Sequence, residues 1–349
     1  MKQIKIKEEE IINIISKNIF DFKNNTFKIR FVLFLNKCLY LIIILLASKI
    51  INSTINKIKD IQKKELFKNM TNFDYHLFER EMITEKMIKY ADWQLLNNEP
   101  YFINGIIRKL KPKKCLEIGV AYGGASIIIL NALKDINNSF LVSLDLSSNL
   151  YSNNSLKTGC RVEQYFPELL NKWHLYTGEQ SHKFLDRLNM TFDFLFLDTR
   201  HTTPGELINI IEVLPFLDDN AIIVLHDIMF HLPSHNYISP REVKYHPSNI
   251  FLMTSLYGDK IIINNKEKGA ENIGAIFLYP NQKRYYLNYF LLLLTPWEYM
   301  PDDIHLNELR AFIEKYYKNE IYLNLFNRAI EENKIYINKF KTLYRQIFK

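Results

Sequence analysis

Cysteine is scarce in this sequence, and no cysteine lies in a metal-binding pattern. The three cysteines, Cys38, Cys115 and Cys160, are far apart among 349 residues, with no C-x-x-C pair and no pair of histidines beside them. This spacing argues against a disulfide framework and against a zinc site built on cysteine. Because such a chain is typical of a reducing compartment, we expect a cytoplasmic protein.

The sequence also lacks an apolar run of the length that crosses a bilayer. Residues 31–51 are its most apolar segment, but Lys37 and Lys49 interrupt them, and the longest uncharged piece, residues 38–48, has 11 residues. A helix needs about 20 residues to span the hydrocarbon core. Three interpretations of residues 31–51 stay open: a helix that packs within the protein or against a second copy, a helix that lies on the inner face of a membrane, and an anchor whose lysines reach the headgroups.

The chain after residue 70 carries no excess of positive charge. Of the 45 Lys and Arg and the 38 Asp and Glu, residues 1–70 hold 14 and 6, so that 31 basic and 32 acidic residues follow. The formal net charge of +7 therefore belongs to the N-terminal region alone. No signature of a nucleic-acid-binding module is present, and we expect no nucleic-acid partner.

Composition and pattern predict three regions without a low-complexity linker between them. Residues 1–75 read as a basic, apolar helical extension, residues 76–285 as the main domain with a helical cap, and residues 286–349 as a helical C-terminal extension. The shift in composition marks the first boundary.

After Lys111 and Pro112, short apolar strands alternate with helical segments. This alternation predicts an α/β fold with a doubly wound, mostly parallel sheet of seven strands, whose ligand site lies at the carboxyl ends of the strands. The predicted strands are residues 115–118, 140–145, 174–177, 192–197, 221–225, 260–263 and 273–279.

Residues 114–130 read as a buried strand, a glycine turn and a helix. Gly119 and Gly123 allow the backbone to approach a ligand closely, and the helix N-terminus behind them offers unpaired N–H groups, which favours a nucleotide-like ligand. The dinucleotide fingerprint G-x-G-x-x-G needs its second glycine where Ala121 stands. An NAD-dependent oxidoreductase is therefore disfavoured.

Polar residues close the second and third predicted strands. Asp145 ends the second strand, where a carboxylate can accept hydrogen bonds from the ribose hydroxyls of a nucleoside; the alternative is a helix cap near Ser147. Gly178 and Glu179 lie in the turn after the third strand, where the adenine edge of a ligand could be bound.

The next two strands end in carboxylates and imidazoles. Asp198 ends the fourth strand with His201 three residues later, and His226 and Asp227 follow the fifth. Because the carboxyl ends of adjacent parallel strands meet at one edge, we expect these side chains to lie together. Carboxylates with imidazoles bind a divalent metal, or one imidazole acts as a base near neutral pH. Each histidine alone is more often structural, but together they predict a site.

These motifs resemble those of the class I S-adenosylmethionine-dependent methyltransferases, and more narrowly the bacterial O-methyltransferase-like group related to sugar and macrolide methyltransferases. The sequence LEIGVAYGGAS resembles their first motif, SLDLS the acidic second motif, and DFLFLDTRH and AIIVLHDI the motifs of the fourth and fifth strands. The resemblance covers about residues 100–280 and implies a Rossmann-like methyltransferase sheet with helical extensions.

The resemblance also implies which residues hold the cofactor. Glu117 and the turn glycines would hold the methionine part and the sulfonium, and Asp145 the ribose. The cofactor-binding residues so implied are Glu117, Gly119, Tyr122, Gly123, Ser126, Asp145, Gly178, Glu179 and Asp198.

In metal-dependent members of this class, acidic residues after the fourth and fifth strands hold Mg²⁺. Asp198 and Asp227 match two of those ligand positions, and His201 matches the base that takes the proton of a substrate hydroxyl. Arg200 stands where many members have a second Asp, and Ile228 stands where catechol-type members have Asn. The implied catalytic set is therefore His201, Asp198 and Asp227, with Mg²⁺ as a possible second cofactor.

From these residues we expect S-adenosylmethionine-dependent O-methyl transfer to a hydroxyl of a sugar, a glycan or a related bacterial metabolite. The alternative is a catalytically inactive membrane-surface binding module that keeps the sheet and attaches through its N-terminal region, with residues 31–51 as the peripheral contact. A homo-oligomer is compatible with both.

Overall fold

The computed structural model describes most of the chain after residue 81. The predicted segment 31–51 lies outside the described residues, as does the whole of the predicted region 1–75, so both stay predictions. In the part that is described, no helix has both the length and the apolar character needed to cross a membrane. The described ranges are residues 82–92, 94–96, 98–228, 248–265 and 269–347.

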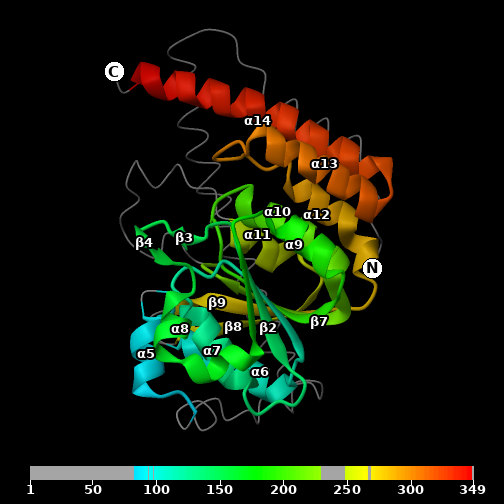
Figure 1. Cartoon of the computed structure of the whole chain (residues 1–349). Helices are drawn as coiled ribbons and strands as arrows, with labels where there is room; N and C mark the ends of the chain where they lie inside the picture. Colours follow the sequence, from blue (N-terminus) through cyan, green and yellow to red (C-terminus); the bar gives the residue numbers. More distant parts are fainter. Residues whose placement is uncertain (1–81, 93, 97, 229–247, 266–268, 348–349) are drawn as a thin grey trace. The chain divides into compact units, whose positions relative to one another are not determined.

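One sheet of seven strands is the centre of the described structure, in the order β5-β2-β1-β6-β7-β9-β8 (Figure 1). The first five strands in that order pair in parallel, and β9 pairs antiparallel with β7 and β8. This confirms the predicted doubly wound, mostly parallel sheet. The strands are β1 (Lys114–Ile118), β2 (Phe140–Asp145), β5 (Trp173–Thr177), β6 (Phe192–Leu197), β7 (Leu217–His226), β8 (Gly258–Asn265) and β9 (Gly269–Leu278).

Alternate residues of the central strands belong to two hydrophobic clusters, one on each face of the sheet. Cys115 and Phe194 face one cluster, whereas Leu116 and Leu195 face the other. This is the pattern of strands that are buried on both faces, and it explains why they read as continuous apolar runs. The helices of the first face are α5 (Glu85–Ala91), α6 (Glu99–Leu110), α7 (Gly124–Leu133) and α8 (Cys160–Tyr165).

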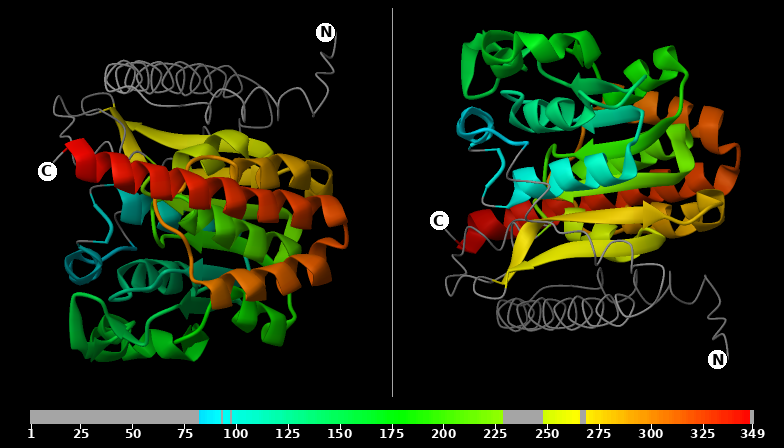
Figure 2. Two further views of the ribbon diagram at one scale, coloured as in Figure 1. Left: turned by 90° about the horizontal axis from the view of Figure 1, so that it is seen from above. Right: turned by 90° about the horizontal axis from the view of Figure 1, so that it is seen from below.

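The second face of the sheet is covered by helices from the later part of the chain. Figure 2 shows α14 in red, in front of the sheet in the view from above and behind the sheet in the view from below. The hydroxyl of Tyr317 donates to the carbonyl of Ile211 at 2.6 Å, so the C-terminal helices share the core of the sheet. These helices are α9 (Ser181–Leu188), α10 (Gly205–Val213), α11 (Ser248–Ser255), α12 (Tyr286–Leu292), α13 (Asp303–Tyr317) and α14 (Glu320–Ile347).

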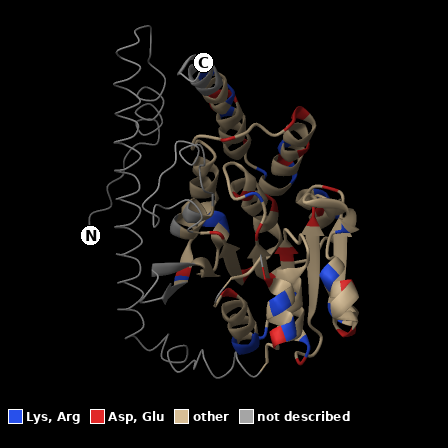
Figure 3. Ribbon diagram, turned by 90° about the vertical axis from the view of Figure 1, so that its left-hand side faces the viewer, with Lys and Arg blue, Asp and Glu red and all other residues tan. Residues whose placement is uncertain are grey.

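Local signals set the helix boundaries. The Thr84 side chain caps α5 by accepting from the backbone N–H of Met87 at 3.2 Å, and Asp302 caps α13 in the same way through His305 at 2.8 Å. Helix α6 ends at Leu110, and its C-cap Lys111 has a left-handed φ of +52° just before Pro112. Along the described helices, basic and acidic residues are interspersed (Figure 3).

A short hairpin after β2 was not predicted. Strands β3 (Asn149–Leu150) and β4 (Asn153–Lys157) pair antiparallel outside the main sheet. The sequence NNSLK of β4 is mostly exposed and has no apolar alternation, so it carries no strand signal.

Candidate active site

Gly119 brings the end of β1 against the loop that follows β6. Its φ is +90°, and a Cβ at this position would lie 1.8 Å from the carbonyl oxygen of Asp198. Only glycine fits such a contact. Strands β1 and β6 pair so that Ile118 lies opposite Leu197, and the strand order reverses between them. The glycine turn therefore meets the acidic strand end at the point where open α/β sheets bind ligands.

Several N–H groups of the turn and of the first residue of α7 are paired within the protein, so the unpaired donors expected behind the turn do not include these groups. Asp145 Oδ2 accepts from the N–H groups of Val120 and Ala121 at 2.9 and 3.1 Å. The Gln94 amide donates to the carbonyl of Val120 at 3.0 Å, and its Oε1 accepts from Gly124 N at 2.7 Å. Backbone donors that are packed away from water need such partners.

Glu117 lies beneath the turn and is fully buried. Its Oε2 accepts hydrogen bonds from the hydroxyls of Ser126, at 2.7 Å, and Ser143. Burial raises the pKa of Glu117 to about 7, although those two hydrogen bonds oppose the rise. Its Oε1 is buried and has no hydrogen-bond partner among the described residues. One acceptor under the turn is therefore available to a donor of a bound ligand, while Ser126 is engaged with Glu117.

Tyr122 and Gly123 lie on the outer side of the turn. The Tyr122 hydroxyl is 2.9 Å from Ser152 Oγ, and the Arg161 guanidinium lies 4.4 Å from the centre of its ring. Gly123 has a φ of +89°, and a Cβ there would lie 2.8 Å from a methyl group of Val162. The turn thus needs glycine at both ends.

The ends of β2 and β5 are tied together beside the turn. Gly178, with a φ of +93°, donates its N–H to the carbonyl of Asp145 at 3.1 Å. The other carboxylate oxygen of Asp145 accepts from Ser147 N at 2.8 Å. Glu179 forms an ion pair with Arg187 at the surface. The structure therefore brings Asp145 and Gly178 together but directs the Glu179 side chain to α9.

Asp198, His201 and Asp227 converge at the ends of β6 and β7. His201 Nε2 lies 3.0 Å from Asp227 Oδ2, and its Nδ1 lies 3.8 Å from Asp198 Oδ1. Asp227 has a φ of +52°, a left-handed conformation that a residue other than glycine adopts at some energetic cost. His226 joins the group, with Nδ1 3.3 Å from Asp198 Oδ1.

Two further carboxylates of this cluster have no signal in the sequence. Glu206 of α10 is fully buried, with Oε1 3.4 Å from His201 Nδ1 and 3.1 Å from Thr199 N. Glu99, in the first turn of α6, lies with Oε2 3.1 Å from His226 Nε2. Glu99 is 127 residues from its partner in sequence, so no local pattern could have revealed the contact.

The excess of carboxylates controls the charge of both imidazoles. Burial alone would lower the pKa of His201, but hydrogen bonds with Asp227 and Glu206 outweigh it and raise the pKa to about 10. Burial likewise opposes a charge on His226, yet Asp198 raises the pKa of His226 well above its usual value. Burial would raise the pKa of Asp227, but the hydrogen bond from His201 lowers it. In this arrangement His201 is positively charged at neutral pH, and the carboxylates also favour the charged form of His226.

The same residues fit a divalent cation. Asp198, His201 and Asp227 each offer one ligand atom, and these atoms lie within 4.8 Å of one another. Ile228 is buried and offers no ligand, but the amide of Asn272 on β9 donates to Asp227 Oδ1. An amide therefore reaches this carboxylate from another strand. The ligand atoms of this cluster come from two carboxylates and one imidazole, and the metal stays a prediction.

Arg200 does not enter the cluster. Its guanidinium lies 3.5 Å from the centre of the Tyr299 ring, a stacked cation–π contact. Arg200, which stands where the resembling motif has an Asp, is thus held beside the site by the segment between α12 and α13.

Comparison with known proteins gives one family match. Residues 116–228 match the model of a methyltransferase domain, which covers Gly119, Asp145, Asp198 and Asp227. No curated protein matches the chain. Among solved structures, the O-methyltransferase TomG from Streptomyces achromogenes, in complex with S-adenosylmethionine, is 15% identical over 60% of this chain and 95% of that chain, with a TM-score of 0.42. An O-methyltransferase from Bacillus cereus is 14% identical over 57% and 90%, with a TM-score of 0.39.

Proposed function

We propose that the chain transfers a methyl group from S-adenosylmethionine to a hydroxyl oxygen, on the premise that residues 116–228 match the model of a methyltransferase domain. The contact between Gly119 and the carbonyl of Asp198 carries this proposal. It joins the turn that would bind the cofactor to the carboxylate–imidazole cluster that would bind the acceptor. A two-substrate reaction requires both at one rim, because the reacting atoms must lie about 3 Å apart.

The cofactor side is formed by the turn and the neighbouring strand ends. Gly119, Tyr122 and Gly178 line it, and the unpartnered Oε1 of Glu117 suits the ammonium of an amino acid. Asp145 would exchange part of its backbone partners for ribose hydroxyls. When bound, S-adenosylmethionine supplies a methyl group that is already activated by its sulfonium, so the protein contributes placement and exclusion of water.

The acceptor side needs a neutral His201. The imidazole takes the proton of the substrate hydroxyl as the new oxygen–carbon bond forms and the carbon–sulfur bond breaks. Asp198 and Asp227 orient the hydroxyl. Because the carboxylates hold His201 protonated at neutral pH in the ligand-free arrangement, added positive charge at the cluster promotes loss of that proton. Asp198 and Asp227 would hold a divalent cation such as Mg²⁺, which would supply such a charge.

We assign the acceptor to the hydroxyls of sugars, glycans or related bacterial metabolites. The resemblance of the strand-end motifs to sugar methyltransferases supports this class. Contact of residues 31–51 with a membrane surface, where glycolipid acceptors are found, stays part of the proposal.

Isothermal titration of the full chain with S-adenosylmethionine tests the cofactor. We expect saturable binding with a dissociation constant in the micromolar range. Titration of Mg²⁺ should give a second binding heat that Asp198→Asn removes. The enzymatic proposal fails if millimolar S-adenosylmethionine produces no binding, whatever the result with Mg²⁺.

Replacing Glu206 by glutamine should shift the pH dependence of methyl transfer. Activity requires neutral His201 and therefore rises as pH passes through its pKa, which the Glu206 hydrogen bond and charge raise. Removing that charge lowers the pKa of His201, so the rising limb of the kcat/KM profile should move about one unit toward lower pH.

The matched control for this prediction is Glu168→Gln, which removes an exposed carboxylate from the 3-10 turn Pro167–Lys172. Its pH profile should coincide with that of the wild type. A Glu206→Gln profile that stays in place or moves to higher pH would rule out control of His201 by Glu206.

A further inference from the structure

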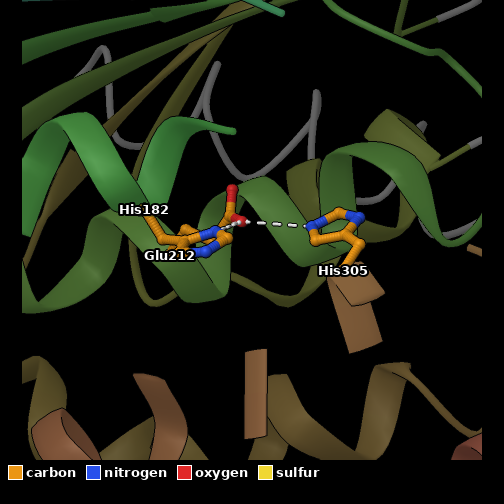
Figure 4. A group of neighbouring side chains, drawn as sticks. All are labelled: His182, Glu212 and His305. Carbon is orange, nitrogen blue, oxygen red and sulfur yellow. Dashed lines mark hydrogen bonds and ion pairs between the residues drawn. The ribbon is translucent and has the colours of Figure 1, made fainter. Parts of the chain in front are cut away.

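A second group of buried metal-binding side chains lies apart from the proposed active site. His182 is in the first turn of α9, Glu212 lies near the end of α10, and His305 is in the first turn of α13 (Figure 4). One ligand atom of each residue lies within 4.8 Å of the others. The methyl-transfer proposal uses none of the three.

Both imidazoles point at the same oxygen of Glu212. His182 Nδ1 lies 2.8 Å from Glu212 Oε1, and His305 Nε2 lies 3.7 Å from that oxygen. The imidazole rings are nearly parallel, with their centres 5.8 Å apart. Three ligand atoms on a tetrahedral Zn²⁺ ion, each about 2.0–2.1 Å from the metal, lie about 3.4 Å from one another. The distances of 2.8 and 3.7 Å from Glu212 Oε1 to the two histidine nitrogens lie on either side of that value.

Without an ion the group leaves a polar atom unsatisfied. His305 Nε2 is buried, and its 3.7 Å separation from Glu212 is too long for a hydrogen bond, so it has no such partner among the described residues. A buried nitrogen in that state destabilises the folded protein. Since Glu212 is fully buried, an ion bound between the three side chains would satisfy His305 and neutralise the carboxylate together.

Neighbouring residues are arranged as supports for metal ligands. Asn209 Nδ2 donates to Glu212 Oε2 at 3.0 Å, which leaves Oε1 directed toward the two histidines. His182 Nε2 lies 3.6 Å from Glu308 Oε2. A histidine that binds metal through one nitrogen usually directs the N–H of the other to a carboxylate, and Glu308 lies on that side of His182, just beyond hydrogen-bond distance.

The group lies close to the protein surface on one side. Glu308 is partly exposed and pairs with Lys183 at 2.7 Å. The side chain of His305 is 15% exposed, compared with 7% for His182. The open side of the group is therefore the side of α13.

We propose that His182, Glu212 and His305 form a binding site for one borderline divalent cation such as Zn²⁺. The ion fastens α13 to α9 and α10, and so fixes the C-terminal helices to the methyltransferase domain. Asn209 links this site to the active-site loop, because it donates to Glu212 and accepts from Thr199 Oγ1 at 2.8 Å. Thr199 directly follows Asp198 in the chain. Two imidazoles and one carboxylate are a donor set that suits Zn²⁺ better than Mg²⁺.

Titration with Co²⁺ tests the site, because Co²⁺ replaces Zn²⁺ and absorbs visible light according to its ligands. The full-length protein is first stripped with a chelator, titrated with Co²⁺ and then back-titrated with Zn²⁺. We expect one equivalent of Co²⁺ to give a visible band that Zn²⁺ displaces. The band should persist in His201→Gln, which alters the other candidate metal cluster.

His305→Gln is the decisive variant. The backbone N–H of residue 305 still donates to the Asp302 carboxylate that caps the helix, so α13 keeps its N-terminus. The variant should bind Co²⁺ at least tenfold more weakly, and Zn²⁺ should no longer raise its melting temperature, whereas saturating Zn²⁺ should raise that of the wild type by about 5 °C. Circular dichroism checks that it is folded.

The proposal is overturned if wild-type protein gives no stoichiometric band. It is also overturned if His305→Gln keeps the wild-type affinity while His201→Gln loses it, since the ion would then belong to the cluster at Asp198 and Asp227. His182→Gln gives an independent repeat of the His305 result.

Discussion

Replacement of Gly119 by alanine is expected to abolish cofactor binding. A Cβ at this position would lie 1.8 Å from the carbonyl oxygen of Asp198 and 2.6 Å from its carbonyl carbon, and the φ of +90° already excludes most side chains. The backbone of the turn or of the β6 loop must move, and both contribute to the proposed site. We expect the dissociation constant for S-adenosylmethionine to rise at least a hundredfold, measured by isothermal titration below the melting temperature of the variant.

Ala121→Gly is the matched control for this prediction. Ala121 has a φ of +45° in the same turn, so glycine removes strain there instead of adding it. This variant should keep the cofactor affinity of the wild type within about threefold and should be at least as stable. A Gly119→Ala protein that binds S-adenosylmethionine as tightly as the wild type would refute the proposed role of the contact.

Replacement of His201 by glutamine should remove most methyl transfer and leave cofactor binding intact. Glutamine keeps hydrogen-bonding groups near Asp227 but cannot take a proton, and a positioned general base contributes about 10²–10⁴-fold to rate. We expect kcat to fall within that range. The measurement is transfer of a labelled methyl group to an acceptor identified first with the wild type in a screen of sugars and glycan extracts.

His174→Gln is the control, because His174 is an exposed histidine on β5, an edge strand separated from β6 by β2 and β1. Its turnover should match that of the wild type. If His201→Gln retains full turnover, His201 is not the base, and Asp198 or Asp227 becomes the first residue to test in that role.

The strands of the sheet were predictable because their environment is uniform. Phe192–Leu197 and Phe140–Asp145 were predicted with the bounds that the structure shows, since strands covered on both faces are mostly apolar. The order of these strands then places Asp198 and Asp227 at one rim. The hairpin at Asn153–Lys157 was missed because its side chains are exposed, which removes the pattern that predicts a strand.

The site was predictable only where its residues end strands. Glu99, Glu206 and Asn272 reach His226, His201 and Asp227 through packing of helices and of β9, and nothing near them in sequence marks that contact. The histidine of α13 escaped prediction for the same reason, since its segment reads as a packing helix.

The sequence by itself determined the α/β sheet, the glycine turn and the polar residues at the strand ends. Each of these features has a local signal in the chain: a run of apolar residues, a glycine, or a polar residue directly after an apolar strand. The tertiary structure decided which groups are paired. It paired the N–H groups of Val120, Ala121 and Gly124 with Asp145 and Gln94, and it surrounded His201 with carboxylates that raise its pKa to about 10. Hydrogen bonds and charge interactions depend on distance in space, and chain folding alone sets that distance.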